Sequence, residues 1–165
     1  ELLKRNINLH RILAHSPGAT RAFGGLGQYI RYGTTMDARL RELAILQVGW
    51  LAKSPYEWSH HVKIGFDFGV TEDDVQKLIA ESAGEDTDLA DIDKAVLRAA
   101  REMTQDGKVA DGTYAELAAH FSKEHLIDVL VTTAFYNAVV RFLASTEMDV
   151  EESYQPYLDQ FPLPE

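Results

Sequence analysis

Apolar side chains recur at helical spacing along almost the whole chain, and glycine, proline and polar residues separate one apolar segment from the next. Spacings of three and four residues place these side chains on one face of a helix. No stretch shows the sustained alternation that is typical of a half-buried strand. The predicted helices cover residues of about 2–13, 19–32, 36–53, 55–68, 72–82, 92–105, 113–120 and 122–146. The pattern therefore predicts an all-α bundle of about eight helices.

The predicted helix from about residue 36 to 53 is expected to be the central one. Its residues Leu43 to Ala52 are apolar on every side except at Gln47. A helix that is apolar all round is normally buried. Thr34 to Asp37 fits a capping box at the start of this helix.

The length of 165 residues fits one domain, which we expect to span residues 1–165. The segment from Tyr154 to Glu165 carries three prolines and two tyrosines. We therefore expect residues 150–165 to form an extended arm that packs on this chain or on a neighbouring copy.

The densest group of reactive side chains lies on the next predicted helix. Ser54 is its predicted N-cap, Pro55 its first residue and Glu57 its third. Glu57 and His61 are four residues apart and share one helix face, at the edge of an apolar stripe. Partial burial there raises the pKa of a carboxyl group and lets a carboxylate tune a histidine. His60 points toward the opposite side and is expected to be exposed.

Glu42 is the third candidate, at the entrance to the central apolar helix. A buried carboxylate needs a partner, because an unpaired buried charge is costly. A carboxyl–imidazole–carboxyl cluster of Glu42, His61 and Glu57 would be suited to moving a proton on and off carbon or oxygen.

Each candidate also has a purely structural interpretation. Glu57 fits the capping position, where its side chain would bond back to the N-cap amide. Glu42 can pair with Arg39 or Arg41, and His61 can be a hydrogen-bonded core histidine. The remaining histidines are expected to be structural or on the surface; they are His10, His15, His120 and His125. Two His and two Glu can also ligate a metal, although adjacent histidines on one helix cannot easily reach the same ion.

Composition and charge narrow the classes of function. The formal net charge of −10 argues against nucleic acid and anionic membranes as partners, because both require clustered cations. The absence of cysteine removes thiolate metal sites and cysteine nucleophiles. No Gly-rich loop follows a strand, so no nucleotide cofactor is expected. We see no secretory signal at the start and no long apolar run, and expect a cytoplasmic protein.

At these residues the chain resembles the carboxymuconolactone decarboxylase family, which includes the AhpD-like alkylhydroperoxidases. The matching motifs, within a best-matching core of about residues 36–82, are Arg41 to Val48, Tyr56 to His61 and Gly69 to Thr71. The resemblance implies an all-α AhpD-like bundle that assembles as a homo-oligomer, a dimer, trimer or hexamer. The glycine-bearing segment and the C-terminal arm would suit such an assembly.

The resemblance also implies roles for single residues. The peroxidase branch uses a Glu, two Cys and a His as a proton relay, and the Glu and His fall at Glu42 and His61. The two cysteine positions fall at Ser54 and Glu57, so the resemblance points to the cysteine-free branch. We expect a decarboxylation, isomerisation or lactone reaction on a small organic acid or carbonyl compound, without thiol peroxidase activity. His61 would donate and accept the proton, and Glu57 and Glu42 would orient it.

Two other interpretations stay open: a non-catalytic oligomeric binding or scaffold protein of the same fold, and a metal-dependent hydrolase or lyase. One objection concerns the lactone substrate itself, a polycarboxylate that would have to approach two carboxylates on an acidic protein. Arg39, Arg41 or Arg141 would be needed as a cationic clamp.

Overall fold

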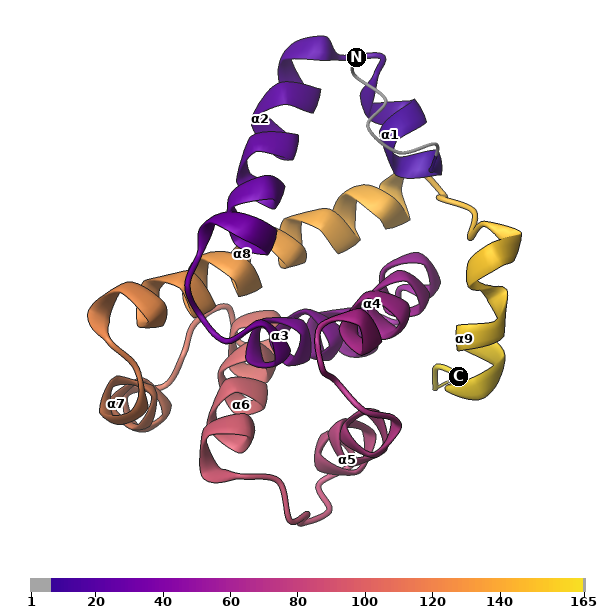
Figure 1. The fold of residues 1–165 in the computed structure, drawn as a ribbon. Coiled ribbons are helices and arrows are strands. Elements are labelled where there is room, and N and C mark those ends of the chain that lie inside the picture. Colours follow the sequence, from indigo (N-terminus) through magenta and orange to yellow (C-terminus); the bar gives the residue numbers. More distant parts are fainter. Residues whose placement is uncertain (1–6, 165) are drawn as a thin grey trace.

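The computed structural model describes residues 7–164, and the part of the chain that it describes contains helices and no strands. The predictions for residues 1–6 and 165 lie outside this range. Figure 1 shows the order of the elements. Their bounds are α1 Asn8–Leu13, α2 Pro17–Gln28, a π-helical turn Tyr29–Gly33, α3 Ala38–Leu51, α4 Pro55–Asp67, α5 Glu72–Ser82, α6 Asp91–Gln105, α7 Asp111–His120, α8 Lys123–Ser145, a 3-10 turn Glu152–Tyr154 and α9 Gln155–Gln160. The all-α prediction is confirmed.

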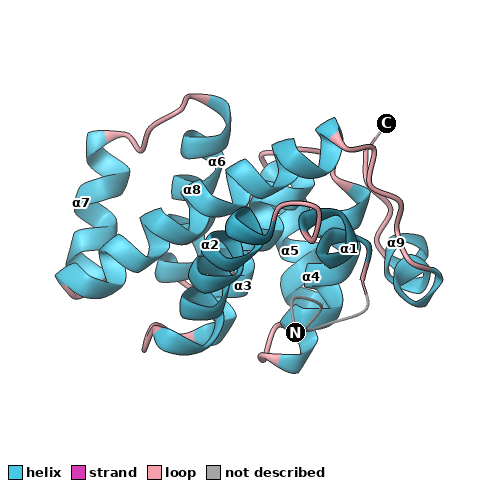
Figure 2. Cartoon of the chain, turned by 90° about the horizontal axis from the view of Figure 1, so that it is seen from above, coloured by secondary structure: helices cyan, strands magenta, loops and turns pink. Residues whose placement is uncertain are grey.

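Helix α3 is the centre of the fold, as its apolar pattern predicted. It is buried from Arg41 to Gly49 and packs against α4, α6 and α8. In Figure 1 it is seen nearly end-on between these helices, and Figure 2 shows the same bundle from above. Its N-cap is Asp37, whose Oδ1 accepts from the Leu40 amide at 3.0 Å. The predicted start at residue 36 is therefore two residues early, because Thr34 bonds to Asp128 and Met36 instead of capping the helix.

Close packing of α3 against α4 positions the residues of interest. A Cβ added at Gly49 would lie 3.4 Å from the Trp58 amide nitrogen and 3.6 Å from Cγ of Glu57. This is contact distance, so glycine lets the two helices approach closely. The closeness brings the polar start of α4 against the middle of α3.

The C-terminal arm is anchored on its own chain and is not fully extended. Pro156 lies in the first turn of α9, where its fixed φ favours a helix. Beyond α9, the Phe161 carbonyl accepts from Nε1 of Trp58 at 2.8 Å, and its side chain is buried. The extended arm was thus predicted wrongly for residues 155–160, and α9 adds a ninth α-helix to the described chain.

Helix α8 is long and apolar enough to meet the length and composition criteria for crossing a membrane. Of its most apolar stretch, 56% is buried inside the fold. It packs on α3 and α6, which is the environment of a core helix.

Arg39 joins three helices at the opposite end of α3 from Gly49. It forms a two-bond pair with Asp93 of α6, both at 2.9 Å, and its Nε donates to Asp74 of α5 at 3.0 Å. Asp74 also closes the capping box of α5 with Thr71.

We expect Arg39→Ala to lower the free energy of unfolding by about 2–3 kcal/mol, because Asp74 and Asp93 would remain buried without their cation. Urea denaturation measures this loss. The matched control is Lys63→Ala, which removes an exposed pair with Asp67 and should change stability by about 0.5 kcal/mol or less. Equal urea midpoints for the two variants would contradict the role given to Arg39.

Candidate functional site

The start of α4 aims Glu57 into the protein instead of back toward its own cap. Ser54 accepts from the Glu57 amide at 3.4 Å, so Ser54 is the N-cap as predicted. The Ser54 amide, however, donates to the Gly49 carbonyl at 3.1 Å. That amide is therefore already satisfied, and the capping role for the Glu57 side chain is not the one the structure shows. The side chain is 4% exposed and faces His61.

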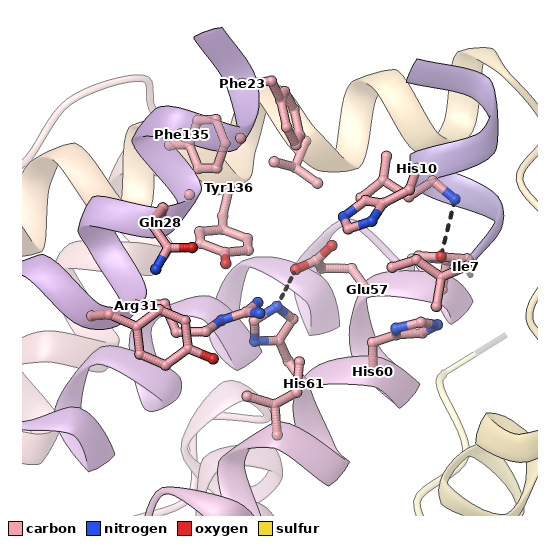
Figure 3. A pocket seen from close by; sticks show the side chains of 17 residues that line it. Ile7, His10, Phe23, Gln28, Arg31, Glu57, His60, His61, Phe135 and Tyr136 are labelled. Carbon is pink, nitrogen blue, oxygen red and sulfur yellow. Dashed lines mark hydrogen bonds and ion pairs between the residues drawn. The ribbon is translucent and has the colours of Figure 1, made fainter. Parts of the chain in front are cut away.

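The imidazole of His61 lies between two buried carboxylates. Its Nδ1 is 2.7 Å from Oε2 of Glu42, and its Nε2 is 3.0 Å from Oε1 of Glu57. The contact to Glu57 lacks hydrogen-bond geometry, so Oε1 has no hydrogen-bond partner in the described chain. Figure 3 shows this contact from close by. The three candidate residues thus lie together, and the His61 ring contacts one carboxylate through each of its nitrogens.

Glu42 is satisfied on both oxygens. Its Oε1 accepts from Nε of Arg41 at 2.9 Å, and its Oε2 faces His61. The ion pair with Arg41 was one of the two predicted partners of Glu42, whereas Arg39 lies in its own pair with Asp74 and Asp93. Arg41 also donates to the Arg31 carbonyl at 3.0 Å, which fixes the π-helical turn against α3.

The pKa values of Glu42 and Glu57 are shifted in opposite directions. Burial is the largest influence on Glu42 and opposes its charge, but His61 and Arg41 together lower its pKa below the ordinary value. Burial also dominates at Glu57 and raises its pKa, with His61 offsetting only part of the effect. Glu57 therefore holds its proton more tightly than an ordinary glutamate, while Glu42 stays ionised.

The cluster lines a cavity of about 410 Å³ between α1, α2, α4 and α8. Glu57 and His61 form one wall, and Phe23, Phe135 and Val139 form an apolar wall across from it. Figure 3 shows Glu57, His61, Arg31 and Tyr136 turned toward the same space. The cluster is thus buried but borders a space large enough for a small molecule.

Arg31 and Tyr136 also line the cavity, and no sequence signal pointed to them. The phenol of Tyr136 interacts with Arg31, and burial raises its pKa, so it stays protonated. Arg31 lies in the π-helical turn and Tyr136 in the middle of α8, far from the motifs in sequence.

His60 is buried, not exposed as predicted. Its ring stacks between Tyr56 and Tyr154 at 4.1 and 3.6 Å, and its Nε2 lies 2.7 Å from Oε2 of Glu151. The C-terminal arm covers the face of α4 that seemed free in the sequence. His60 also lines the cavity, so it belongs to the rim of the site.

The other predicted residues separate clearly. His10, expected to be structural or on the surface, lines the cavity from α1. His15 and His120 are exposed, and His125 bonds to Thr35. Arg141 is exposed and bonds to Asn137, so it does not reach the site.

A single ion cannot be held by the central cluster as it stands, because Glu42 and Glu57 lie on opposite nitrogens of His61. No group of three or more His, Asp or Glu side chains among the described residues is arranged to bind a metal.

The model of the carboxymuconolactone decarboxylase family matches residues 17–102, just over half of the chain. The chain belongs to this family. The match covers Glu42, Glu57 and His61 together with Arg31, and it ends before Tyr136. No curated protein matches in a sequence comparison.

Several solved structures share the fold. The debrominase Bmp8 in complex with 2,3,4-tribromopyrrole is 21% identical with a TM-score of 0.77, over 90% of this chain and 79% of that chain. The AhpD core of a peroxidase-related protein from Ralstonia eutropha JMP134 is 20% identical with a TM-score of 0.76, over 92% and 80%. A protein of unknown function from Agrobacterium tumefaciens is 20% identical with a TM-score of 0.74, over 85% and 95%. These likenesses establish the AhpD-like fold.

We expect the two buried glutamates of this family member to respond oppositely to the same substitution. Glu42→Gln leaves Arg41 and His61 without their anion and should cost about 3 kcal/mol. Glu57→Gln removes a carboxyl group that burial disfavours when charged. Because the folded state raises the pKa of Glu57, its contribution to stability falls as pH rises from the ordinary glutamate range through the raised pKa. The Glu57→Gln substitution removes this loss of stability at high pH.

Thermal unfolding between pH 6 and pH 8.5 checks this expectation. The melting temperature of Glu57→Gln should equal or exceed that of the wild type, most clearly at the upper end of the range, while Glu42→Gln melts lower throughout. A Glu57→Gln variant as unstable as Glu42→Gln would show that Glu57 is a structural ion-pair partner and not a strained site residue.

Proposed function

We propose that the protein is an acid–base enzyme that moves a proton on and off a small organic acid or carbonyl compound, in a decarboxylation, isomerisation or lactone reaction. The supporting observation is the histidine held between two buried carboxylates of opposite pKa shift, beside a cavity of about 410 Å³. Membership of the carboxymuconolactone decarboxylase family agrees with this class of reaction.

We assign the roles differently from the sequence-based expectation. Glu42 fixes the tautomer of His61 by accepting from Nδ1, in the manner of the orienting carboxylate of a catalytic triad. Nε2 of His61 then faces Glu57, so Glu57 is the group that meets a substrate in the cavity. His61 lowers the pKa of Glu57 and so offsets part of the effect of burial.

An isomerisation illustrates the proton balance. In the fraction of the enzyme whose Glu57 is ionised, the Glu57 carboxylate accepts a proton from one carbon of the substrate, and the electron pair of that C–H bond moves into the substrate's carbonyl system. Glu57 then returns the proton to a second carbon, and the enzyme recovers its starting charge. A group poised near neutral pH suits both steps, and burial moves Glu57 in that direction.

The proposal excludes thiol peroxidase chemistry by this chain, which contains no cysteine. Ser54 is occupied as the N-cap of α4, and Glu57 is engaged with His61. The non-catalytic scaffold alternative is disfavoured by the cavity, because a scaffold has no need to hold a buried carboxyl group against open space.

We also propose a homo-oligomer. Helix α2 has no buried residue, and Leu26, Tyr29 and Tyr32 are exposed along it and its π-helical continuation. Such a helix gains stability when a second copy covers it.

Exchange of carbon-bound hydrogen for deuterium tests the enzymatic proposal without knowledge of the product. A panel of small lactones, keto acids and unsaturated acids is incubated with protein in D₂O and followed by NMR. At least one member should exchange at an enzyme-dependent rate that falls roughly 100-fold or more in His61→Gln and Glu57→Gln.

His120→Gln is the matched control, since His120 is exposed on α7, away from the cavity, and should leave the rate unchanged. A rate that survives in folded Glu57→Gln and His61→Gln would overturn the assignment of the cluster as the proton-transfer site.

A further inference from the structure

Arg31 is the one arginine or lysine among the described residues that line the cavity, and Glu57 is the one carboxyl group. Arg41 and Glu42 form a buried ion pair and balance each other. Burial raises the pKa of Glu57, which favours its neutral form beside His61. On the rim, His60 lies beside the carboxylate of Glu151. His10, Tyr56, Tyr32 and Tyr136 are the other titratable groups of the wall.

Arg31 is the group left over in this count. Its side chain lines the cavity, and among the described residues no carboxylate lies within ion-pair distance of it. Glu42 and Glu57 both act on it electrostatically, but Arg41 and His61 occupy both oxygens of Glu42, and Glu57 faces His61. Arg31 instead interacts with the neutral phenol of Tyr136. A guanidinium with no counter-ion at the wall of a partly apolar cavity is a site for an anion from outside.

We propose that Arg31 is the anion-binding residue of this cavity and that its substrate is a small monocarboxylate, held by the guanidinium with its apolar body against Phe23 and Phe135. The single guanidinium of the lining can pair with one negative group, and its planar shape fits a planar carboxylate through two parallel bonds. The rings of Phe23 and Phe135 lie 4.9 Å apart and form a continuous apolar surface beside it. A second carboxylate would have to lie against this surface or against Glu57.

This inference rests on the proposed function only in taking the cavity as the substrate site. It also answers the objection that two buried glutamates would repel an acidic substrate. Glu42 is neutralised by Arg41, and burial favours the neutral form of Glu57, so a single carboxylate meets Arg31 and not two negative charges. None of Arg39, Arg41 and Arg141, the arginines considered as clamps from the sequence, is needed for this role.

Three aromatic probes of the same size test the proposal by titration of the wild-type protein, followed by calorimetry or NMR. Benzoate carries one carboxylate, benzamide is its neutral counterpart, and terephthalate carries two carboxylates. Benzoate should bind at least about tenfold more tightly than benzamide, and terephthalate should bind no more tightly than benzoate. Equal affinity for benzoate and benzamide, tighter binding of terephthalate, or no benzoate binding at millimolar concentration would each overturn the proposal.

Variants then assign the effect to one side chain. Arg31→Met should abolish the preference for benzoate over benzamide, and Arg31→Lys should keep part of it, because an ammonium retains the charge without the two-bond geometry. Arg141→Met is the matched control, since Arg141 is exposed outside the cavity and should have no influence. A full benzoate preference in folded Arg31→Met would reject Arg31 as the anchor. If Arg31→Met does not fold, the wild-type comparison and Arg31→Lys still decide.

The outcomes separate this inference from the proposed function. The benzoate preference should persist in His61→Gln, because binding at Arg31 requires no proton transfer. A protein that prefers benzoate but exchanges no hydrogen would refute the acid–base function and leave the anion site standing. A protein that exchanges hydrogen but does not prefer benzoate would refute the anion site at Arg31 and leave the acid–base function standing.

Discussion

The rest of the site depends on one buried carboxylate, that of Glu42 on the central helix. It is fully buried, and a charge in that position is tolerated only with compensation on every side. Arg41 supplies the cation and His61 the second partner. Because His61 is on α4, the same hydrogen bond fixes the register of α4 against α3. Arg41 extends this order to the π-helical turn through the Arg31 carbonyl.

That chain of contacts explains why a cation and a protonated carboxyl group face one cavity. Fixing the Arg31 backbone places its side chain on the wall, and fixing His61 places Nε2 against Glu57. Glu57 accepts an unfavourable position: its Oε1 is buried without a hydrogen bond, and burial raises its pKa. Strain of this kind, held by better-satisfied neighbours, is characteristic of functional sites. The neighbours here are Glu42 and Arg41.

The parts of the site that a single helix determines could be predicted from the sequence, and the parts assembled from distant segments could not. The four-residue spacing of Glu57 and His61 and the apolar run around Glu42 express local geometry, and the structure brings all three together. The error at His60 has the same origin. The sequence of α4 alone cannot show that another segment covers the His60 face of the helix. The residues that cover it, Glu151 and Tyr154, lie more than ninety residues from His60 in the sequence. Arg31 belongs to none of the sequence motifs. Its importance comes from its place in the cavity wall, where no carboxylate of the described residues lies within ion-pair distance, and only the folded structure shows this.

The C-terminal arm gives the cavity a second, independent support. Glu151 accepts from the Asn8 amide at 2.6 Å, from the Tyr56 hydroxyl at 3.1 Å, and lies beside His60. One carboxylate thus joins the start of α1 to the start of α4. Since α1 contributes Leu9 and His10 to the cavity wall, these contacts of Glu151 help to hold that wall in place. The cluster of Glu42, His61 and Glu57 is therefore held by the core, and part of the cavity wall by the contact between α1 and the C-terminal arm.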